Sequence, residues 1–260
     1  SYELEALKAQ AVCARSYAFR QMTSYGYPEY EAHVNDSTDF QVYNNSQKQE
    51  SSTRAVAETE GQVVRYKGEI ATTYYYSTSC GKTTSLEAWG TDPGGGGEYL
   101  QSVEVCGDQG DYEKDLPWYR WTAQVPVQTL SALVSANTGV QVGTLSSVEV
   151  TKRGPGDVAL QIVATGDAGS VTVDTENKIR SALGGSGYTI TKNDGSTSQS
   201  SALLPSAFFT IEKSGDTFVI SGGGFGHGIG MSQNGANEMA KQGADYRQIL
   251  QTFYKDVEIG

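Results

Sequence analysis

A glycine-rich segment holds one of the two histidines of the chain. Residues 222–236 read GGGFGHGIGMSQNGA, with six glycines in the nine positions around His227. Glycine loses more conformational freedom on folding than any other residue, so this density indicates positive φ angles or the close approach of another molecule. Ser232 and Gln233 follow as polar groups that suit a polar ligand. We interpret the segment as one wall of a ligand groove; the alternative is a glycine-rich hairpin with a structural histidine.

A run of tyrosines followed by hydroxyl residues is the second candidate for chemistry. Residues 74–79 read YYYSTS, and in a strand Tyr75 faces one side while its two tyrosine neighbours face the other. Aromatic rings stack on the C–H faces of sugars, and the hydroxyls of Ser77 and Thr78 suit sugar hydroxyls. The run therefore indicates a carbohydrate site, although packing in a strand core explains any single tyrosine equally well.

Other kinds of site find less support. The sequence CGKTT at 80–84 lacks the first glycine of a phosphate loop, because Tyr76 stands at that position. A zinc site needs grouped cysteines and histidines, but His33 and His227 are far apart and no two cysteines are close, so we expect no metal and no cofactor. No G-x-S-x-G elbow supports a serine hydrolase. His33 reads as an ordinary surface histidine.

Composition excludes further classes of partner. The chain has 260 residues and a net charge of −11, which argues against nucleic acid or an anionic membrane as the main partner, because both require clustered cations. No apolar run approaches the length of about 18 residues that spans a bilayer. A signal-peptide pattern is also missing, and the opening residues already follow a helical pattern, so we expect any membrane anchor to lie upstream of Ser1.

The three cysteines do not form a disulfide framework. Cys80 and Cys106 lie in loop-like, glycine-flanked stretches, and whether they pair in an oxidising compartment stays open. Cys13 lies among alanines in a helical pattern, where we expect a small buried hydrophobic residue.

The elements that must position these residues begin with a helix at 3–22. Its apolar stripe is predicted at three–four spacing, and a second stripe, which carries charge, holds Glu5, Lys8, Val12 and Arg15. The predicted apolar stripe consists of Leu4, Leu7, Ala11, Ala14 and Ala18.

The rest of the chain is predicted to be rich in strands. A hairpin around a Lys-Gly turn is expected over 55–79, and residues 119–220 form a β-rich middle stretch. Within that stretch we predict helices at 125–139 and 176–184, strands over 145–175, an exposed loop at 192–205 and a hairpin through Ser214-Gly215-Asp216. Two helical pieces broken at Gly243 and a terminal VEI complete the chain.

Together these elements predict a mixed α+β fold with a few packed helices. We expect a single domain over 1–260, with 119–220 as a β-rich elaboration within it. A substrate groove is predicted between the core and this elaboration.

Three blocks carry a family resemblance. In this order, they are LEALKAQAVCARSYAF (4–19), YYYSTSCGKTTSLEAWG (74–90) and GFGHGIGMSQNGANEMAKQGADYRQILQTFY (224–254). Together they resemble the SpoIID family of sporulation lytic transglycosylases, whose relatives include amidase enhancers. DFQVY (39–43) and the stretch 55–75 fit between the blocks, so the resemblance covers nearly the whole chain.

The resemblance implies cleavage of peptidoglycan glycan strands. Such enzymes break the β-1,4 bond from N-acetylmuramic acid to N-acetylglucosamine without water and leave a 1,6-anhydro end, using one carboxyl group as general acid. They act outside the cytoplasmic membrane, in the cell wall, anchored to the membrane or in the intermembrane space of a sporulating cell, on strands stripped of stem peptides and alongside an amidase. The alternatives are a non-catalytic peptidoglycan-binding partner that stimulates a cell-wall amidase, and a conventional glycoside hydrolase with two carboxyl groups.

The resemblance also suggests which residues act. In this family an acidic stretch precedes the first block, so the catalytic glutamate is expected either upstream of Ser1 or at Glu5. Some members carry a zinc ion through cysteine and histidine before QVY, but HVNDSTDF at 33–40 has no cysteine, so no metal is expected here. Substrate binding is assigned by motif membership to Lys8, Gln10, Arg15, Tyr75, Ser77, Thr78, His227, Ser232 and Gln233.

Overall fold

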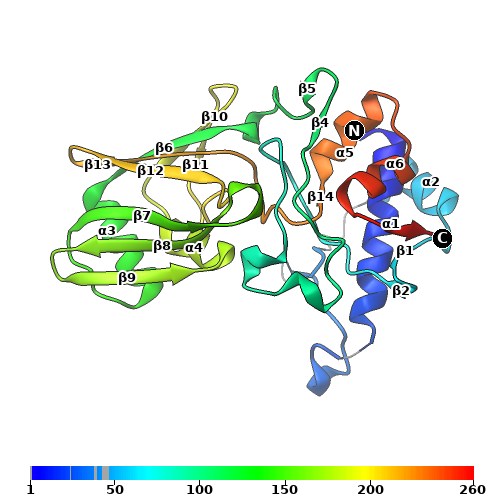
Figure 1. Ribbon diagram of the computed structural model, residues 1–260, viewed down its shortest axis with the longest axis horizontal. Helices are drawn as coiled ribbons and strands as arrows, with labels where there is room; N and C mark the ends of the chain where they lie inside the picture. Colours follow the sequence, from blue (N-terminus) through cyan, green and yellow to red (C-terminus); the bar gives the residue numbers. More distant parts are fainter. Residues whose placement is uncertain (1, 24, 38–39, 43–46) are drawn as a thin grey trace. The chain divides into compact units, whose positions relative to one another are not determined.

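The computed structural model describes residues 2–23, 25–37, 40–42 and 47–260 (Figure 1). The segments 33–40 and 39–43 therefore lie partly outside the described residues. The chain forms two units, which we call the terminal unit (Ser1–Tyr75 with Ala236–Gly260) and the central unit (Tyr76–Gly235). Helices and antiparallel sheets occur together, which confirms the predicted α+β class.

One long helix organises the terminal unit. α1 (Leu4–Gln21) matches the predicted helix closely, but the predicted apolar stripe was wrong, because all five of its residues are only half-buried. Alanines occur on several sides of this helix, so apolar spacing alone does not select the buried face. The face that is buried consists of Ala6, Ala9, Val12, Cys13, Ser16 and Tyr17.

Further helices and a small sheet complete the terminal unit. The turn Lys67-Gly68, with φ angles of 50° and 85°, joins β1 to β2 and confirms the predicted hairpin turn. The start of that hairpin was predicted wrongly, because residues 55–58 belong to a helix, whose last turn (RAVAE) is rich in the good helix formers Ala, Arg and Glu. The elements are α2 (Glu50–Glu58), the short 3₁₀ helix η1 (Pro28–Tyr30), α6 (Tyr246–Phe253) and a sheet in the order β15 (Glu258–Ile259), β1 (Val64–Tyr66), β2 (Glu69–Ile70).

The break between the last two helices lies where the sequence predicts it. α5 (Gln233–Lys241) begins in the central unit and continues into the terminal unit, and Gly243 (φ 94°) ends it. α6 then starts with a capping box, in which the Asp245 side chain and the Gln248 side chain each bond to the other's backbone.

The central unit contains two larger antiparallel sheets, and β12 of the first lies beside β7 of the second (Figure 1). Alternation along β6 buries Trp121, Ala123 and Val125, as expected for a strand with one face in a core. The first sheet has the order β11 (Thr197–Gln199), β10 (Thr189–Lys192), β6 (Trp121–Pro126), β13 (Thr217–Gly222), β12 (Phe209–Ser214), and the second has the order β7 (Leu145–Arg153), β8 (Ala159–Gly166), β9 (Gly169–Asp174).

Helices and short elements cover these sheets. α3 (Val127–Thr138) packs on β6, β7 and β13, and α4 (Glu176–Leu183) packs on β8 and β9. The remaining elements are β4 (Cys106–Gly107) paired with β5 (Gly110–Asp111), β3 (Tyr75–Tyr76) paired with β14 (Met231–Ser232), η2 (Leu86–Trp89), η3 (Pro93–Gly95), η4 (Pro117–Tyr119) and η5 (Pro155–Asp157).

Most predictions for the middle stretch are confirmed. The two helices are α3 and α4, the strands over 145–175 are β7 to β9, and the hairpin through residues 214–216 joins β12 to β13. The predicted loop at 192–205 was wrong in part, since it contains β11. This edge strand consists of Thr, Ser and Gln, a composition that is equally typical of loops.

Candidate functional site

A buried carboxylate joins the two segments that the sequence singled out in the central unit. Glu113 is completely buried. Its Oε1 accepts hydrogen bonds from the Ser79 amide (3.0 Å) and the Ser232 hydroxyl (2.8 Å), and its Oε2 accepts one from the Ser79 hydroxyl. Burying a carboxylate is costly unless its oxygens are bonded. These bonds therefore attach both segments to one fixed point.

Further hydrogen bonds connect the hydroxyl residues to the glycine-rich segment. Thr78 and Phe225 exchange backbone bonds of 3.1 and 2.8 Å. Asn234 donates from its side chain to Thr78 Oγ1 (2.9 Å) and from its backbone to the Ser77 carbonyl (3.0 Å). These hydrogen bonds hold together two segments of the site that are far apart in sequence.

His227 has a defined tautomer and aromatic neighbours. Its Nδ1 accepts a hydrogen bond from the Ile229 amide (3.1 Å), so the neutral imidazole carries its hydrogen on Nε2. The half-buried ring packs against Tyr76 and Trp89, with centroid distances of 5.4 and 5.2 Å. The side chain is therefore oriented as a hydrogen-bond donor within an aromatic setting.

The Tyr76 hydroxyl is a buried polar group of this site. It is buried and has no hydrogen-bond partner among the described residues. Burial, followed by the nearby charge of Glu113, raises the pKa of this phenol well above its ordinary value. A buried polar group of this kind is normally completed by water or by a ligand.

The glycines around His227 are required by their backbone and their surroundings. Gly226 and Gly228 have φ angles of 123° and 82°. A Cβ atom on Gly226 would lie 2.7 Å from Tyr76 Cβ, and one on Gly228 would lie 2.5 Å from the Phe208 ring. The expectation of positive φ is confirmed, and the close approach is to side chains of the protein itself.

In the terminal unit, Glu5 and Lys8 form an ion-pair network. Lys8 Nζ lies 2.7 Å from both Glu5 Oε1 and Glu58 Oε2. The second Glu5 oxygen accepts a bond from the Tyr246 amide (2.9 Å), the first helical residue of α6. The hydrogen bonds that Lys8 donates to Glu5 and Glu58 raise the pKa of Lys8, and the bonds that Glu58 accepts from Lys8 and Arg54 lower the pKa of Glu58. Glu5 thus connects α1 to α6.

Arg15 binds backbone carbonyl groups at the C-terminal end of α2. Its Nη1 donates to the carbonyl oxygens of Thr59 (2.8 Å) and Gln62 (2.7 Å), which lie just beyond the last helical residue. A cation at this position interacts favourably with the helix dipole.

The Tyr75 hydroxyl makes hydrogen bonds with two glutamine side chains. It donates to Gln41 Oε1 (2.7 Å). Burial is the largest cause that raises its pKa to about 12, while a hydrogen bond with Gln10 acts in the opposite direction. Tyr75 and Gln10 therefore belong to one polar group of the terminal unit.

The ten residues predicted for the site divide between the two units. Ser232 and Thr78 are buried behind the surface, whereas Ser77, His227 and Gln233 are half-buried. These five belong to the central unit, and the other five, Glu5, Lys8, Gln10, Arg15 and Tyr75, belong to the terminal unit.

Two neighbours of this site were not singled out from the sequence. Glu113 lies in DYEKDLP, where several charged residues look alike and nothing marks one as buried. Trp89 is part of the second motif block, and its position there is a signal that it belongs beside His227.

The structure also bears on metals, thiols and membranes. Within the described ranges, no three side chains of histidine, cysteine, aspartate or glutamate are grouped as metal ligands. All three cysteines are described and are free thiols; Cys13 is completely buried, as predicted, Cys80 is buried and Cys106 is exposed. Among helices of the described chain, none has the length and apolarity to cross a bilayer.

Comparison with known proteins identifies the family. Residues 1–66 match the family described as Stage II sporulation protein, and residues 101–230 match a domain of unknown function (DUF8618). The chain is 31% identical to Stage II sporulation protein D of Bacillus amyloliquefaciens, over 99% of this chain and 69% of that protein, and 31% identical to its namesake in Bacillus subtilis, over 100% and 69%. It is 29% identical to the amidase enhancer of Bacillus subtilis, over 98% of this chain and 38% of that protein. With similarity that spans both units and all three motif blocks, the chain belongs to the SpoIID family.

Proposed function

We propose that this domain is a peptidoglycan lytic transglycosylase. It cleaves the bond from N-acetylmuramic acid to N-acetylglucosamine, leaves 1,6-anhydromuramic ends, and acts on strands stripped of their stem peptides during sporulation. The observation that carries the proposal is the similarity to Stage II sporulation protein D, which extends over at least 99% of this chain. The place of action is outside the cytoplasmic membrane, where the glycan strands are.

The site in the central unit supports a carbohydrate ligand. Tyr76, Trp89 and His227 group their rings, and such rings supply both apolar area and polar tips. His227 Nε2 is a donor, and the Tyr76 hydroxyl has no hydrogen-bond partner among the described residues. Sugar hydroxyls both donate and accept, so their chemistry suits this group of rings and polar atoms.

The role of Glu5 is the main choice within this mechanism. A general acid must carry a transferable proton toward the leaving oxygen. Both oxygens of Glu5 accept hydrogen bonds from donors of the terminal unit, one of them the Lys8 ammonium, so the protein itself already occupies this side chain. We therefore propose Glu5 as a residue that positions the start of α1, with the acid supplied by the stretch that precedes this block in the family.

Digestion of purified, peptide-stripped glycan strands tests the function, with products identified by mass spectrometry. Three proteins run side by side: this chain, its Glu5→Gln variant, and a longer chain that carries the stretch before Ser1. Anhydromuramic ends from the longer chain alone support both the reaction and our choice of acid. The same ends from this chain, lost in Glu5→Gln, assign the acid to Glu5 instead.

Product chemistry distinguishes the alternatives. Reducing ends in place of anhydro ends identify a conventional hydrolase, because water then replaces the internal C6 hydroxyl as nucleophile. Absence of any cleavage, together with retained glycan binding, contradicts an enzymatic role.

Stimulation of an amidase is the second candidate function, and the similarity to an amidase enhancer favours it. In that case the domain binds peptidoglycan and raises the rate at which a cell-wall amidase removes stem peptides. The test is the release of stem peptides from intact sacculi by the amidase with and without this domain. A rate increase without glycan cleavage supports this second role.

A further inference from the structure

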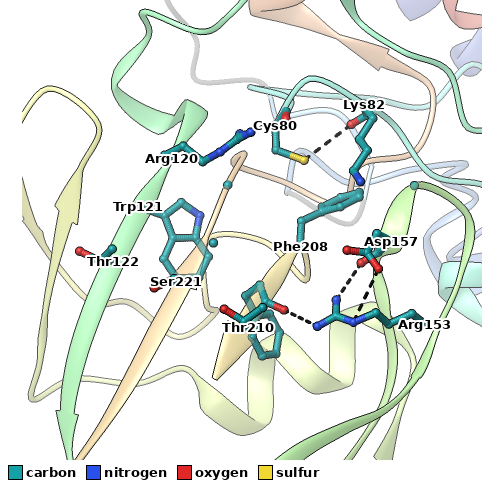
Figure 2. Close-up of a pocket in the computed structure, with 14 residues that line it drawn as sticks. Cys80, Lys82, Arg120, Trp121, Thr122, Arg153, Asp157, Phe208, Thr210 and Ser221 are labelled. Atoms are coloured by element: carbon teal, nitrogen blue, oxygen red, sulfur yellow. Dashed lines mark hydrogen bonds and ion pairs between the residues drawn. The ribbon is translucent and has the colours of Figure 1, made fainter. Parts of the chain in front are cut away.

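A cavity of about 370 Å³ lies within the central unit, apart from the His227 rings (Figure 2). Its walls come from the second motif block, the start of β6, the β12–β13 hairpin and the β7–β8 connection. The floor is aromatic, with Trp121 and Phe209 buried beneath it. The residues that matter to the argument are Lys82, Arg120, Arg153, Asp157, Trp121 and Phe208.

Cations outnumber carboxylates around this cavity. Three of its lining residues are Lys or Arg and one is Asp, whereas the whole chain carries a net charge of −11. Figure 2 shows Lys82 and Arg120 on opposite sides of Cys80, with Arg153 and Asp157 at another edge of the cavity. The local charge is therefore opposite to that of the protein as a whole, which favours an anionic ligand.

Arg153 makes hydrogen bonds and an ion pair with other residues of the cavity. It donates to the carbonyl oxygens of Asp157 and Phe209, both at 2.9 Å, and its Nε lies 3.6 Å from Asp157 Oδ1. Its charge is thus balanced by the one carboxylate of the cavity.

Among the described residues, the charges of Lys82 and Arg120 have no such neighbouring carboxylate. Arg120 donates to the carbonyl oxygens of Cys80 (3.0 Å) and Tyr119 (2.8 Å) and to the Tyr119 hydroxyl (3.1 Å), and its guanidinium lies over the Tyr119 ring. The Tyr119 hydroxyl in turn donates to Asp111. In the described part of the chain, no carboxylate lies within 4.0 Å of the Arg120 guanidinium, and the Lys82 ammonium has neither a carboxylate nor a hydrogen-bond partner. The Lys82 ammonium and the remaining N–H groups of Arg120 are thus available to a ligand.

Glycines set the shape of this wall. A Cβ atom on Gly223 would lie 2.8 Å from Cys80 Cβ and 3.0 Å from Arg120 Nη1, and one on Gly222 would lie 2.3 Å from the Trp121 ring. Larger residues would displace the arginine and the floor. The first glycines of the glycine-rich segment therefore serve this cavity, while those around His227 serve the neighbouring site.

We propose that the cavity binds the lactyl carboxylate of a muramic residue, with Lys82 and Arg120 as its charge partners. This inference rests on the proposed function. When a stem peptide is removed, the amide C–N bond breaks, water supplies OH to the lactyl carbonyl carbon and H to the peptide amine, and a free carboxylate remains on the sugar. The lactyl methyl group then faces the aromatic floor. A strand that keeps its peptides has a neutral amide at this position and forgoes both charge-assisted bonds.

Binding of small muramic compounds tests the cavity without any cleavage. The probes are N-acetylmuramic acid, its lactyl methylamide, and N-acetylglucosamine, titrated against the intact chain by NMR. We expect about tenfold tighter binding of the acid than of the methylamide, the effect of about one charge-assisted hydrogen bond. The preference should be clearly smaller in Lys82→Gln, persist in Lys82→Arg, and persist in Lys178→Gln, which removes an exposed lysine of α4. Circular dichroism checks that each variant is folded.

A muramic acid coupled through its lactyl group to a dipeptide distinguishes the two sources of carboxylate. It lacks the lactyl carboxylate but carries one at the peptide end. Weak binding, like that of the methylamide, supports the lactyl assignment. Binding as tight as that of the free acid overturns it in favour of a peptide carboxylate, and equal binding of acid and methylamide overturns the cavity as an anion site.

Digestion separates this inference from the proposed function. Stripped strands whose lactyl carboxylates have been converted to methylamides should be cleaved about tenfold less efficiently than untreated strands. Equal cleavage of both overturns the inference and leaves the transglycosylase intact. Selective binding of N-acetylmuramic acid without cleavage by any chain supports the cavity and contradicts the proposed function.

Discussion

Burial separates the three thiols at the scale of single residues. Burial raises the pKa of Cys13 to about 12 against a small opposing effect of its hydrogen bond with Tyr254, and burial also raises that of Cys80. Cys106 is exposed. Since the thiolate is the reactive form, burial slows the reactions of Cys13 and Cys80, and its exposure favours Cys106.

We therefore expect one fast-reacting thiol in the native protein at about pH 8, Cys106, with Cys80 slower and Cys13 protected until the chain unfolds. Alkylation with iodoacetamide, mapped by peptide mass spectrometry, checks the order. The control is the urea-unfolded chain, in which all three should react alike. Early labelling of Cys13 in the native protein would contradict its burial.

A glycine can be required by strain alone or by strain and crowding together. Gly228 and Gly195 have similar φ angles, 82° and 79°. A Cβ atom on Gly228 meets the Phe208 ring, whereas one on Gly195 meets nothing within 4 Å. The pair separates the two effects within the same unit.

Gly195→Ala should lower the free energy of unfolding by about 1 kcal/mol, from strain. Gly228→Ala should lower it by about 3 kcal/mol, because overpacking adds to the same strain. Urea unfolding of both variants measures the difference. Equal decreases in the free energy of unfolding would show that the residues around Gly228 adjust to the added methyl group without loss of stability.

At the scale of elements, Glu113 attaches the end of β3 and the start of α5 to one another. Hydrogen bonds to its two oxygens come from Ser79 and Ser232, and Ser232 also accepts from the Gly235 amide (3.2 Å) in the first turn of α5. A single buried side chain thus adds to the backbone bonds between the two segments.

Glu113→Ala should lower the free energy of unfolding by about 3 kcal/mol or more, because it leaves several buried donors unsatisfied. Glu113→Gln should cost much less, since the amide oxygen keeps two bonds and the amide group donates to a serine hydroxyl that accepts. Thermal and urea unfolding of both variants checks this order. A stable Glu113→Ala protein would mean that water replaces the carboxylate.

At the scale of the whole molecule, several buried acids have pKa values raised mainly by burial. Besides Cys13, burial raises those of Tyr75 and Tyr188 to about 12. The unfolded chain ionises these groups near their ordinary values, 9.0 and 10.0. Their contribution to stability is therefore fully present below about pH 9 and is lost as pH rises toward about 12.

We expect the free energy of unfolding to fall steeply between about pH 8 and about pH 10.5. The Cys13→Ala variant lacks one of these groups, so its decrease over that interval should be smaller by about 1–2 kcal/mol. Urea unfolding of both proteins at the two pH values measures it. Parallel decreases would show that Cys13 ionises normally in the fold.

Local pattern accounts for the features that the sequence predicts well. The extent of α1, the hairpin through Gly215 and the helix break at Gly243 depend on neighbours in sequence, through spacing and backbone preference. The family could also be recognised from the sequence, because the three motif blocks and their order are visible in the chain itself.

The sequence by itself determined these elements, the positive φ angles around His227 and the burial of Cys13. Only the tertiary structure decided which face of α1 is buried, that Glu113 accepts from Ser79 and Ser232, and that Lys82 and Arg120 flank one cavity. The physical reason is that burial and electrostatic pairing depend on distance in space. The partners of a buried carboxylate or a cation come from residues far apart in sequence. A local sequence pattern therefore does not show which carboxylate becomes buried among donors, or which cation has no carboxylate beside it.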